Sequence, residues 1–228
     1  MCGDREIKKG GKMTRPCSKR KFLARKIGVT SLCVVIILAV AALGGCDAVK
    51  RAAYEGVDRD SWQYPARVIE SLNIRPGSRV ADLGSGDGYF TFRLARAVGP
   101  EGGVYAVDID KDRNEHVAKQ AREEGLKNIE VILAEKNDPL LPATGVDLIF
   151  ASNSYHHLED RTKYFAAVKK YLRPNGRVAI IDFRKGAFRH FTESSVIRNE
   201  MQAAGYRLQK EYDFLPRQHF LIFSPSGT

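Results

Sequence analysis

From residue 62 onward, apolar segments alternate with amphipathic ones along the chain. Runs that are almost continuously apolar predict buried strands, at residues 79–83, 103–109, 129–134, 146–152 and 177–183. Between them, apolar residues recur at helical spacing, which predicts helices over 89–98, 113–125 and 160–172. Strands that alternate with helices and are apolar on both faces indicate an α/β domain with a doubly wound, mostly parallel sheet.

Two further strand-like runs follow near the end of the sequence, at 206–212 and 219–224. Only the turn-like FLPRQ segment, residues 214–218, lies between them, so the pair predicts an antiparallel hairpin. The pattern therefore predicts a seven-stranded sheet with this hairpin at one edge.

The hydrophobic pattern near the N-terminus is of another kind. Residues 27–45 contain no charged side chain and follow a basic stretch. A basic region, an apolar region and then small residues is the order of a secretory signal. The run also has the roughly 17–25 residues that a membrane-spanning helix needs. Either interpretation leaves the basic flank in the cytoplasm and the following domain outside.

The LGGC stretch at 43–46 resembles the lipobox of bacterial lipoproteins. That resemblance implies cleavage before Cys46 and lipidation of Cys46, which would anchor the domain on the non-cytoplasmic side of a membrane. The alternatives are an uncleaved signal anchor, or a misassigned start that leaves the protein cytoplasmic. We expect a signal peptide or membrane anchor over 1–45, a polar tether over 46–61 and the folded domain over 62–228.

Charge and cysteines are concentrated at the same end of the chain. The net charge is +10, but the first 45 residues hold ten basic and two acidic residues, which leaves 27 and 25 for the remainder. A nearly neutral domain argues against a nucleic-acid partner. All four cysteines lie within the first 46 residues, so the domain has neither a disulfide framework nor a cysteine metal site.

A glycine-rich stretch, VADLGSGDG, ends the first predicted strand. Gly84, Gly86 and Gly88 permit a tight turn and close approach of the backbone to a ligand. The stretch lacks the lysine and hydroxyl residue of a phosphate loop, and its GxGxG spacing differs from the GxGxxG of dinucleotide sites. Asp82 stands where a pyrophosphate would approach, and its carboxylate suits a cationic ligand instead.

Asp108 ends the second predicted strand, 24 residues after Gly84. An acid near this offset binds ribose hydroxyls in Rossmann-type sites. Together with Asp82, it indicates a nucleoside ligand that has no phosphates and carries a positive end.

These motifs resemble those of class I S-adenosylmethionine-dependent methyltransferases, over residues 62–223, and most closely the group that includes quinone-biosynthesis enzymes. The resemblance implies S-adenosylmethionine as the cofactor. It also implies that the DxGxGxG motif, here Asp82, Gly84, Gly86 and Gly88, turns beneath the methionine moiety.

The same resemblance assigns the nucleoside contacts. It implies that Asp108 binds the ribose and that Ile109 packs against the adenine. The loop after the third strand would reach the adenine amino group. Because AEKNDPLLP departs from the family's GDAxxLP pattern, Glu135, Asn137 and Asp138 remain alternatives for that contact.

The segment ASNSYHHLED is similar to the family's NxxHHL stretch at the mouth of the pocket, and LRPNGRVAIIDF is similar to its LxPGGxLxxxD strand. His156 or His157 is a candidate general base or substrate-orienting group, with His156 preferred. The alternative is that one histidine packs beneath the loop and the other caps the helix that begins near Asp160. Adjacent histidines rarely bind one metal ion, and no third ligand is evident.

Other residues near the expected site have two interpretations each. Tyr155 either stacks on a ligand or forms ordinary pocket wall. Trp62 and Tyr64 belong to a lid over the cofactor or to a simple apolar clasp. Lys169 and Lys170 are expected on a solvated helix face.

The sequence thus favours a membrane-tethered methyltransferase that acts on a small-molecule or lipid-like acceptor. The main alternative is an exported ligand-binding protein on the same fold, since S-adenosylmethionine is made in the cytoplasm. A dinucleotide-dependent oxidoreductase is disfavoured by the glycine spacing and by Asp82.

Overall fold

The computed structural model describes residues 58–227, nearly all of the compact unit that begins at Asp58. The expected signal peptide or anchor, the lipidation at Cys46 and almost all of the tether lie outside the described residues. Within the described residues, none of the helices has the length and hydrophobicity that a membrane span requires.

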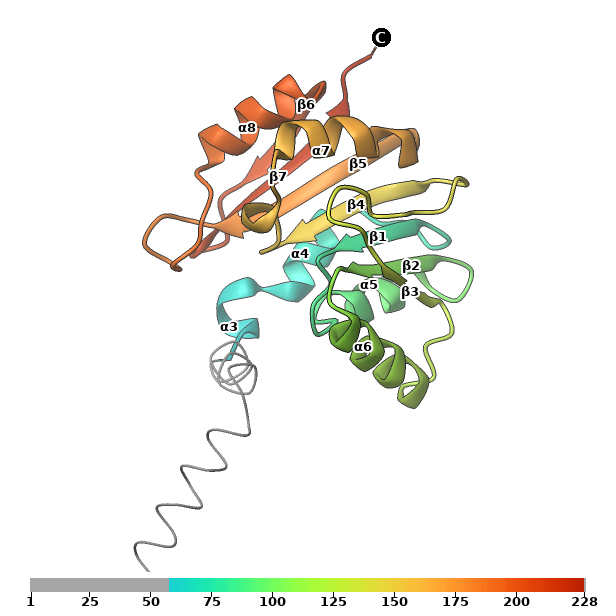
Figure 1. The fold of residues 1–228 in the computed structure, drawn as a ribbon. Helices are drawn as coiled ribbons and strands as arrows, with labels where there is room; N and C mark the ends of the chain where they lie inside the picture. The colour runs from blue at the N-terminus through green and yellow to red at the C-terminus, as the bar shows by residue number, and fades with distance from the viewer. Residues whose placement is uncertain (1–57, 228) are drawn as a thin grey trace, which may run out of the picture. The chain divides into compact units, whose positions relative to one another are not determined.

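A seven-stranded sheet, in the order β3-β2-β1-β4-β5-β7-β6, forms the centre of this unit (Figure 1). The strands are β1 (Arg79–Leu83), β2 (Gly103–Asp108), β3 (Ile129–Leu133), β4 (Val146–Ser152), β5 (Leu172–Phe183), β6 (Tyr206–Tyr212) and β7 (Gln218–Pro225). β1 to β5 pair in parallel, and β7 runs antiparallel to both β5 and β6. The predicted fold class and C-terminal hairpin are confirmed.

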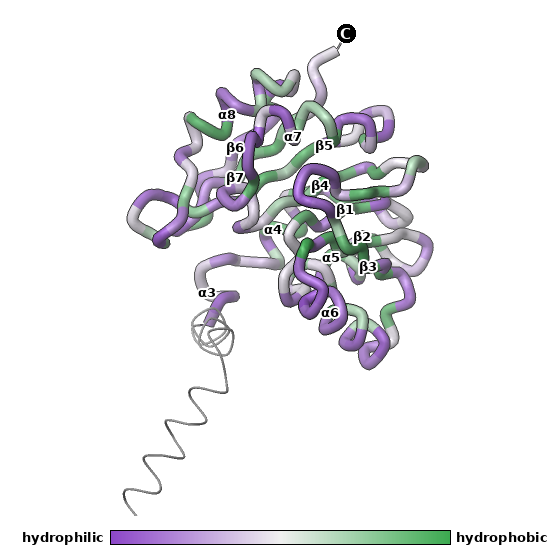
Figure 2. The backbone as a smooth tube through the Cα atoms, viewed as in Figure 1, coloured by the Kyte–Doolittle hydropathy of each residue, from purple (hydrophilic) through white to green (hydrophobic). Residues whose placement is uncertain are grey.

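Helices cover both faces of the sheet. They are α3 (Asp60–Gln63), α4 (Pro65–Ser71), α5 (Thr91–Val98), α6 (Lys111–Glu123), α7 (Arg161–Val168) and α8 (Ser194–Ala203), with 3-10 turns η1 (Tyr155–His157) and η2 (Lys169–Tyr171). One core lies between the sheet and α4 and α5, and α6 packs beside it. The other lies between the sheet and α7 and α8. Figure 2 accordingly shows hydrophobic strands inside and hydrophilic stretches along the helices.

Several elements differ from the prediction, and the short helices α3 and α4 were not predicted. The helix expected to reach residue 172 ends as α7 at Val168, and β5 already begins at Leu172. Asn175 takes a φ of +65° there, and the β4–β5 register shifts, so the PNG turn signal marks an irregularity near the start of β5 and not a separate loop. α8 was not predicted; its only signal is the pair Ile197 and Met201, which are buried at a spacing of one helical turn.

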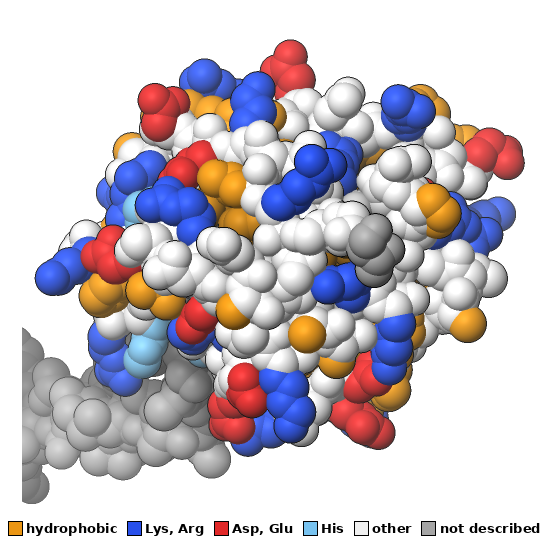
Figure 3. All heavy atoms as spheres, turned by 90° about the horizontal axis from the view of Figure 1, so that it is seen from above, with side chains coloured by type: hydrophobic (Ala, Val, Ile, Leu, Met, Phe, Trp, Pro, Cys, Tyr) orange, Lys and Arg blue, Asp and Glu red, His pale blue; other side chains and the backbone are white. Residues whose placement is uncertain are grey.

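The carboxyl ends of β1, β2, β4 and β5 meet at one edge of the sheet. The strand order reverses between β1 and β4, which is where doubly wound sheets bind ligands. Acidic and basic side chains are interspersed over the face that Figure 3 shows. That no nucleic acid binds stays a prediction.

Candidate active site

The glycine turn after β1 is restricted to glycine for two reasons. Gly84 and Gly88 take φ values of +70° and +83°, in the left-handed region that L residues rarely adopt. A Cβ atom at Gly88 would also lie 2.5 Å from the ring of Phe92, and one at Gly84 would collide with Ser154. The structure therefore explains why glycine stands at both positions; that a ligand approaches the backbone here stays a prediction.

Asp82 lies under this turn, 3% exposed, and accepts a 2.6 Å hydrogen bond from the hydroxyl of Thr91. Burial raises the pKa of Asp82 to about 7, against the opposing effect of the Thr91 hydrogen bond and with a smaller contribution from Asp108. A cationic ligand beside this carboxyl group would favour its ionised form.

Asp108 joins the end of β2 to the glycine turn. Its Oδ2 accepts a hydrogen bond from the amide of Gly86 at 2.9 Å, and its Oδ1 accepts one from the amide of Asp110 at 3.0 Å. A carboxylate accepts about four hydrogen bonds, so capacity for ribose hydroxyls remains. Ile109 follows, 68% exposed, and offers an apolar surface beside that position.

The loop after β3 holds the three residues that are candidates for the contact with the adenine amino group, and they differ in their present contacts. Asp138 accepts hydrogen bonds from Lys170 at 2.9 Å and from Tyr171 at 2.7 Å. Burial opposes the shift, but these hydrogen bonds lower the pKa of Asp138 overall. The carboxylate is thus engaged with the turn before β5, whereas Glu135 and Asn137 are exposed. The expectation that Lys170 belongs to a purely solvated face was incomplete.

His156 forms a buried pair with Asp182. Its Nδ1 lies 2.6 Å from Asp182 Oδ1, and the two side chains are 4% and 0% exposed. Asp182 Oδ1 also accepts a hydrogen bond from the amide of Phe183. A carboxylate at Nδ1 holds the proton there and leaves the lone pair of Nε2 available. Within the described residues, the buried Nε2 has no hydrogen-bond partner.

The alternatives for the neighbouring residues are also resolved in part. Asp160 caps α7 with its own side chain, which accepts from the amide of Lys163, so neither histidine is the cap. His157 is more exposed than His156, and burial followed by the nearby His156 lowers its pKa. Tyr155 is wholly buried and donates a hydrogen bond to Glu200 at 2.7 Å, so it belongs to the core and not to a ligand-contacting surface.

Unpartnered buried polar atoms gather around the His156–Asp182 pair. Among residues 58–227, seven buried side-chain atoms have no hydrogen-bond partner. Two belong to Ser85 and Asn114, beside the glycine turn and the start of α6. The other five are His156 Nε2, Asp182 Oδ2, Thr192 Oγ1, Gln218 Oε1 and His219 Nε2. Asp182 and His219 are partners in the β5–β7 register.

Sequence reasoning assigned no role to Asp182, Thr192, Gln218 or His219. The one available signal was the final acid of the LRPNGRVAIIDF motif, which is Asp182. Buried polar groups without partners are uncommon and indicate a place where a ligand or water completes the hydrogen bonding.

A short segment at the start of the described unit crosses this edge of the sheet. Gln63 in α3 is fully buried and donates a 3.1 Å hydrogen bond to Ser152 at the end of β4. The ring of Trp62 lies 6.0 Å from that of Phe183 at the end of β5. Tyr64 is 38% exposed. α3 therefore contacts the ends of both β4 and β5.

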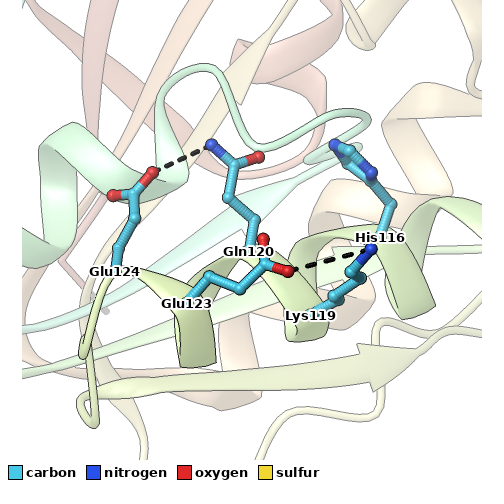
Figure 4. Close-up of a pocket in the computed structure, with 5 residues that line it drawn as sticks. All are labelled: His116, Lys119, Gln120, Glu123 and Glu124. Atoms are coloured by element: carbon cyan, nitrogen blue, oxygen red, sulfur yellow. Dashed lines mark hydrogen bonds and ion pairs between the residues drawn. The ribbon is translucent and has the colours of Figure 1, made fainter.

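A hollow of about 360 Å³ lies elsewhere, along the outer side of α6 (Figure 4). The residues that line it make ordinary surface contacts with one another, including a 3.8 Å ion pair between Lys119 and Glu123 and a hydrogen bond from Gln120 to Glu124. These residues lie in the middle and C-terminal part of α6, away from Asp108, which precedes the helix.

The fold, the glycine turn and the acid at the end of β2 define a Rossmann-like α/β domain that binds a nucleoside ligand. A family described as a methyltransferase domain matches residues 74–213, and the chain belongs to that family.

Curated methyltransferases are similar to part of this chain. Aklanonic acid methyltransferase of Streptomyces sp. is 36% identical over 54% of this chain and 56% of its own length. Nocamycin O-methyltransferase of Saccharothrix syringae is 34% identical over 50% of this chain and 41% of its own length. A ubiquinone/menaquinone biosynthesis C-methyltransferase of Vibrio vulnificus is 30% identical over 53% of this chain and 46% of its own length. The chain spans about half the length of these relatives.

Solved structures agree with the fold. An S-adenosylmethionine-dependent methyltransferase from Aquifex aeolicus superposes with a TM-score of 0.67 at 26% identity, over 72% of this chain and 91% of that one. A fibrillarin from Aeropyrum pernix that contains S-adenosylmethionine has a TM-score of 0.53 at 19% identity, over 66% and 67%, which shows the fold alone.

The residues at the β1–β2 end of this edge fit S-adenosylmethionine. Asp82 suits a cationic group, Asp108 has acceptor capacity for ribose hydroxyls, and Ile109 presents an apolar surface for a base. The unpartnered Ser85 Oγ and Asn114 Oδ1 supply further polar atoms beside these positions. The cofactor expected from the sequence is thus supported by family, fold and site.

Proposed function

We propose that this protein transfers the methyl group of S-adenosylmethionine to an oxygen or an acidic carbon of a small-molecule or lipid-like acceptor. The observation that carries the proposal is the buried His156–Asp182 pair, whose unpartnered Nε2 lies at the same edge of the sheet as the glycine turn. That pairing is the arrangement of an oriented general base.

In this proposal, the residues at the ends of β1 and β2 bind the cofactor, and the His156–Asp182 pair acts on the acceptor. Bound S-adenosylmethionine supplies an electrophilic methyl group, and Asp82, Asp108 and Ile109 hold it. His156 Nε2 accepts the proton from the acceptor's O–H or C–H group. Asp182 keeps the imidazole in the required orientation and stabilises the imidazolium that forms. Most of the remaining rate enhancement comes from alignment of the acceptor in a pocket that excludes water.

Aromatic side chains near the histidine favour an acceptor with a planar ring. The ring of Phe183 lies 6.3 Å from that of His156, 4.8 Å from that of Phe188 and 6.0 Å from that of Trp62. One group of relatives is named for ubiquinone and menaquinone biosynthesis, and a quinone is a planar ring of this kind.

The first experiment measures binding of S-adenosylmethionine and S-adenosylhomocysteine to the full chain in detergent by calorimetry. Transfer of a labelled methyl group to hydroxylated naphthalenes and anthraquinones then follows. Incorporation that is lost in His156→Gln but kept in His157→Gln supports the proposal. Loss confined to His157→Gln would instead assign the base to the more exposed neighbour and contradict the role of His156.

We also propose that the domain is tethered to a membrane through the N-terminal segment, with Cys46 lipidated. The support is the order of basic, apolar and small residues before LGGC. Cys46→Ala should leave a larger, unprocessed precursor on a gel. An unchanged band would contradict lipidation.

The export signal favours a second candidate, a ligand-binding protein on this fold without catalysis, because fold alone does not fix function. In that case the full chain binds a ligand at the glycine turn, but no labelled methyl group appears in any acceptor.

A further inference from the structure

Arg59, directly before α3, is a mostly buried cation beside the glycine turn. Its side chain is 17% exposed, and its guanidinium carbon lies 3.7 Å from the centre of the Tyr89 ring. Its Nε donates a hydrogen bond to Gln63 Oε1 at 2.5 Å. Because Gln63 also donates to Ser152 at the end of β4, Arg59 lies between the β1 turn and the β4 end, where the strand order reverses.

The charge of Arg59 is only weakly compensated. The nearest carboxylate oxygen is Asp87 Oδ1, 3.8 Å from Nη1, whereas a charge-assisted hydrogen bond spans about 2.7–2.9 Å. Asp87 is itself 38% exposed. Within the described part of the chain, the terminal nitrogens of Arg59 make no hydrogen bond. A buried guanidinium with free donors favours an anion with two oxygens. In agreement, burial lowers the pKa of Arg59.

A neighbouring arginine shows the contrast. Arg93 also lies over Tyr89, at 4.2 Å, but both oxygens of Asp60 accept hydrogen bonds from its Nη2 at 3.1 Å, and its Nη1 donates to the carbonyl of Tyr89. Arg93 is therefore committed to holding α3 on α5. It serves as a matched control, since it shares the stacking partner but has its own anion.

We propose that Arg59 is the carboxylate-binding residue for the amino-acid end of the cofactor. The inference rests on S-adenosylmethionine as the ligand. The carboxyl group Asp82 lies close enough to act electrostatically on Arg59, and its position suits the positive groups of the same moiety. The positive groups of the amino-acid moiety thus lie beside the carboxyl group of Asp82, and its carboxylate lies beside the guanidinium of Arg59. A simple nucleoside has neither group, so these contacts distinguish the cofactor from it.

The test compares S-adenosylhomocysteine with 5′-methylthioadenosine, which keeps the nucleoside and thioether but has no amino-acid end. Calorimetry on the full chain in detergent should show that Arg59→Met weakens binding of S-adenosylhomocysteine at least tenfold and changes that of methylthioadenosine less than twofold. Arg59→Lys should restore part of the loss, because lysine keeps the charge without the planar fork.

Arg93→Met should alter the two affinities by similar, smaller factors. Equal weakening of both ligands by Arg59→Met would mean that Arg59 only holds α3 in place, and an unchanged or tighter affinity would mean that no carboxylate contacts it; either result overturns the inference. If the unmodified chain binds neither ligand, the cofactor assignment itself fails, and the inference fails with it.

Discussion

The carboxyl edge of the sheet has two halves: a cofactor half at the ends of β1 and β2, and a proposed acceptor half at the ends of β4 and β5 and the start of β7. The two halves differ in how many of their buried polar groups have hydrogen-bond partners. On the β1–β2 side, the Asp108 carboxylate accepts from the amides of Gly86 and Asp110, so the chain's own backbone already holds it. On the β4–β5–β7 side, five buried polar atoms have no hydrogen-bond partner in the described structure, against two on the other side, although one of the five, His219 Nε2, lies 3.9 Å from Glu193 Oε2. Under the proposed function, the fold preorganises the site for a constant cofactor, whereas the acceptor half depends on its substrate to complete the hydrogen bonding.

The strongest way to test this contrast is to remove the base of the acceptor half. His156→Gln should lower kcat by about 10²–10⁴-fold, the usual contribution of a positioned general base. The affinity for S-adenosylhomocysteine should stay within twofold, because the histidine lies outside the cofactor half. Steady-state methyl transfer and calorimetry on the same preparation measure both. A parallel loss of cofactor affinity would show that the halves are not separate.

The reciprocal change addresses the cofactor half. Asp108→Ala should weaken binding of S-adenosylhomocysteine by roughly 10–100-fold, since hydrogen bonds to a charged group contribute about 1.5–3 kcal/mol. At saturating cofactor, kcat should change little. Titration calorimetry checks the first result and saturation kinetics the second. If Asp108→Ala binds S-adenosylhomocysteine with unchanged affinity, Asp108 does not contact the cofactor.

The glycine turn should be more sensitive to substitution than a comparable turn outside the site. Gly88→Ala combines a positive φ with a collision against Phe92, whereas Gly125, just after α6, has a φ of +69° and open space around it. Both alanines cost about 1–2 kcal/mol for the left-handed backbone, and Gly88→Ala should cost a further 1–3 kcal/mol for overpacking. Urea unfolding of the two variants measures the difference, and equal losses would mean that Phe92 moves aside freely.

The last expected effect concerns Asp82 and the pH dependence of stability. Its folded-state pKa, about 7, exceeds the value near 3.9 of an unfolded chain, so its contribution to stability is greatest at low pH and is lost as pH rises through 7. Asp82→Asn does not titrate. About two pKa units of the Asp82 shift fall between pH 5 and pH 8, which correspond to about 3 kcal/mol. The Tm of Asp82→Asn relative to the unmodified protein should therefore be higher at pH 8 than at pH 5, by roughly 5–10 °C. Thermal unfolding at both values would show a constant difference if Asp82 ionises normally.

Sequence reasoning succeeded where contacts are local. Gly84, Gly88 and Asp108 lie at the ends of two consecutive strands joined by one helix, so the sequence could predict that the glycine turn and Asp108 meet, as the hydrogen bond from the Gly86 amide to Asp108 shows. The alternation of strands and helices fixed the parallel sheet for the same reason. α8 was missed because only two of its apolar positions are buried at helical spacing.

By itself, the sequence determined the class of fold and the class of enzyme with its cofactor, and it predicted which residues at the ends of β1 and β2 bind that cofactor. Only the tertiary structure decided that Asp182 pairs with His156, that Asp138 pairs with Lys170 and that Arg59 lies beside the glycine turn with Asp87 as a distant, weak partner. These contacts join residues 26 or more positions apart. Their formation depends on how separate strands are brought side by side, because burial and partner distance are properties of the packed chain that no local pattern of residues encodes.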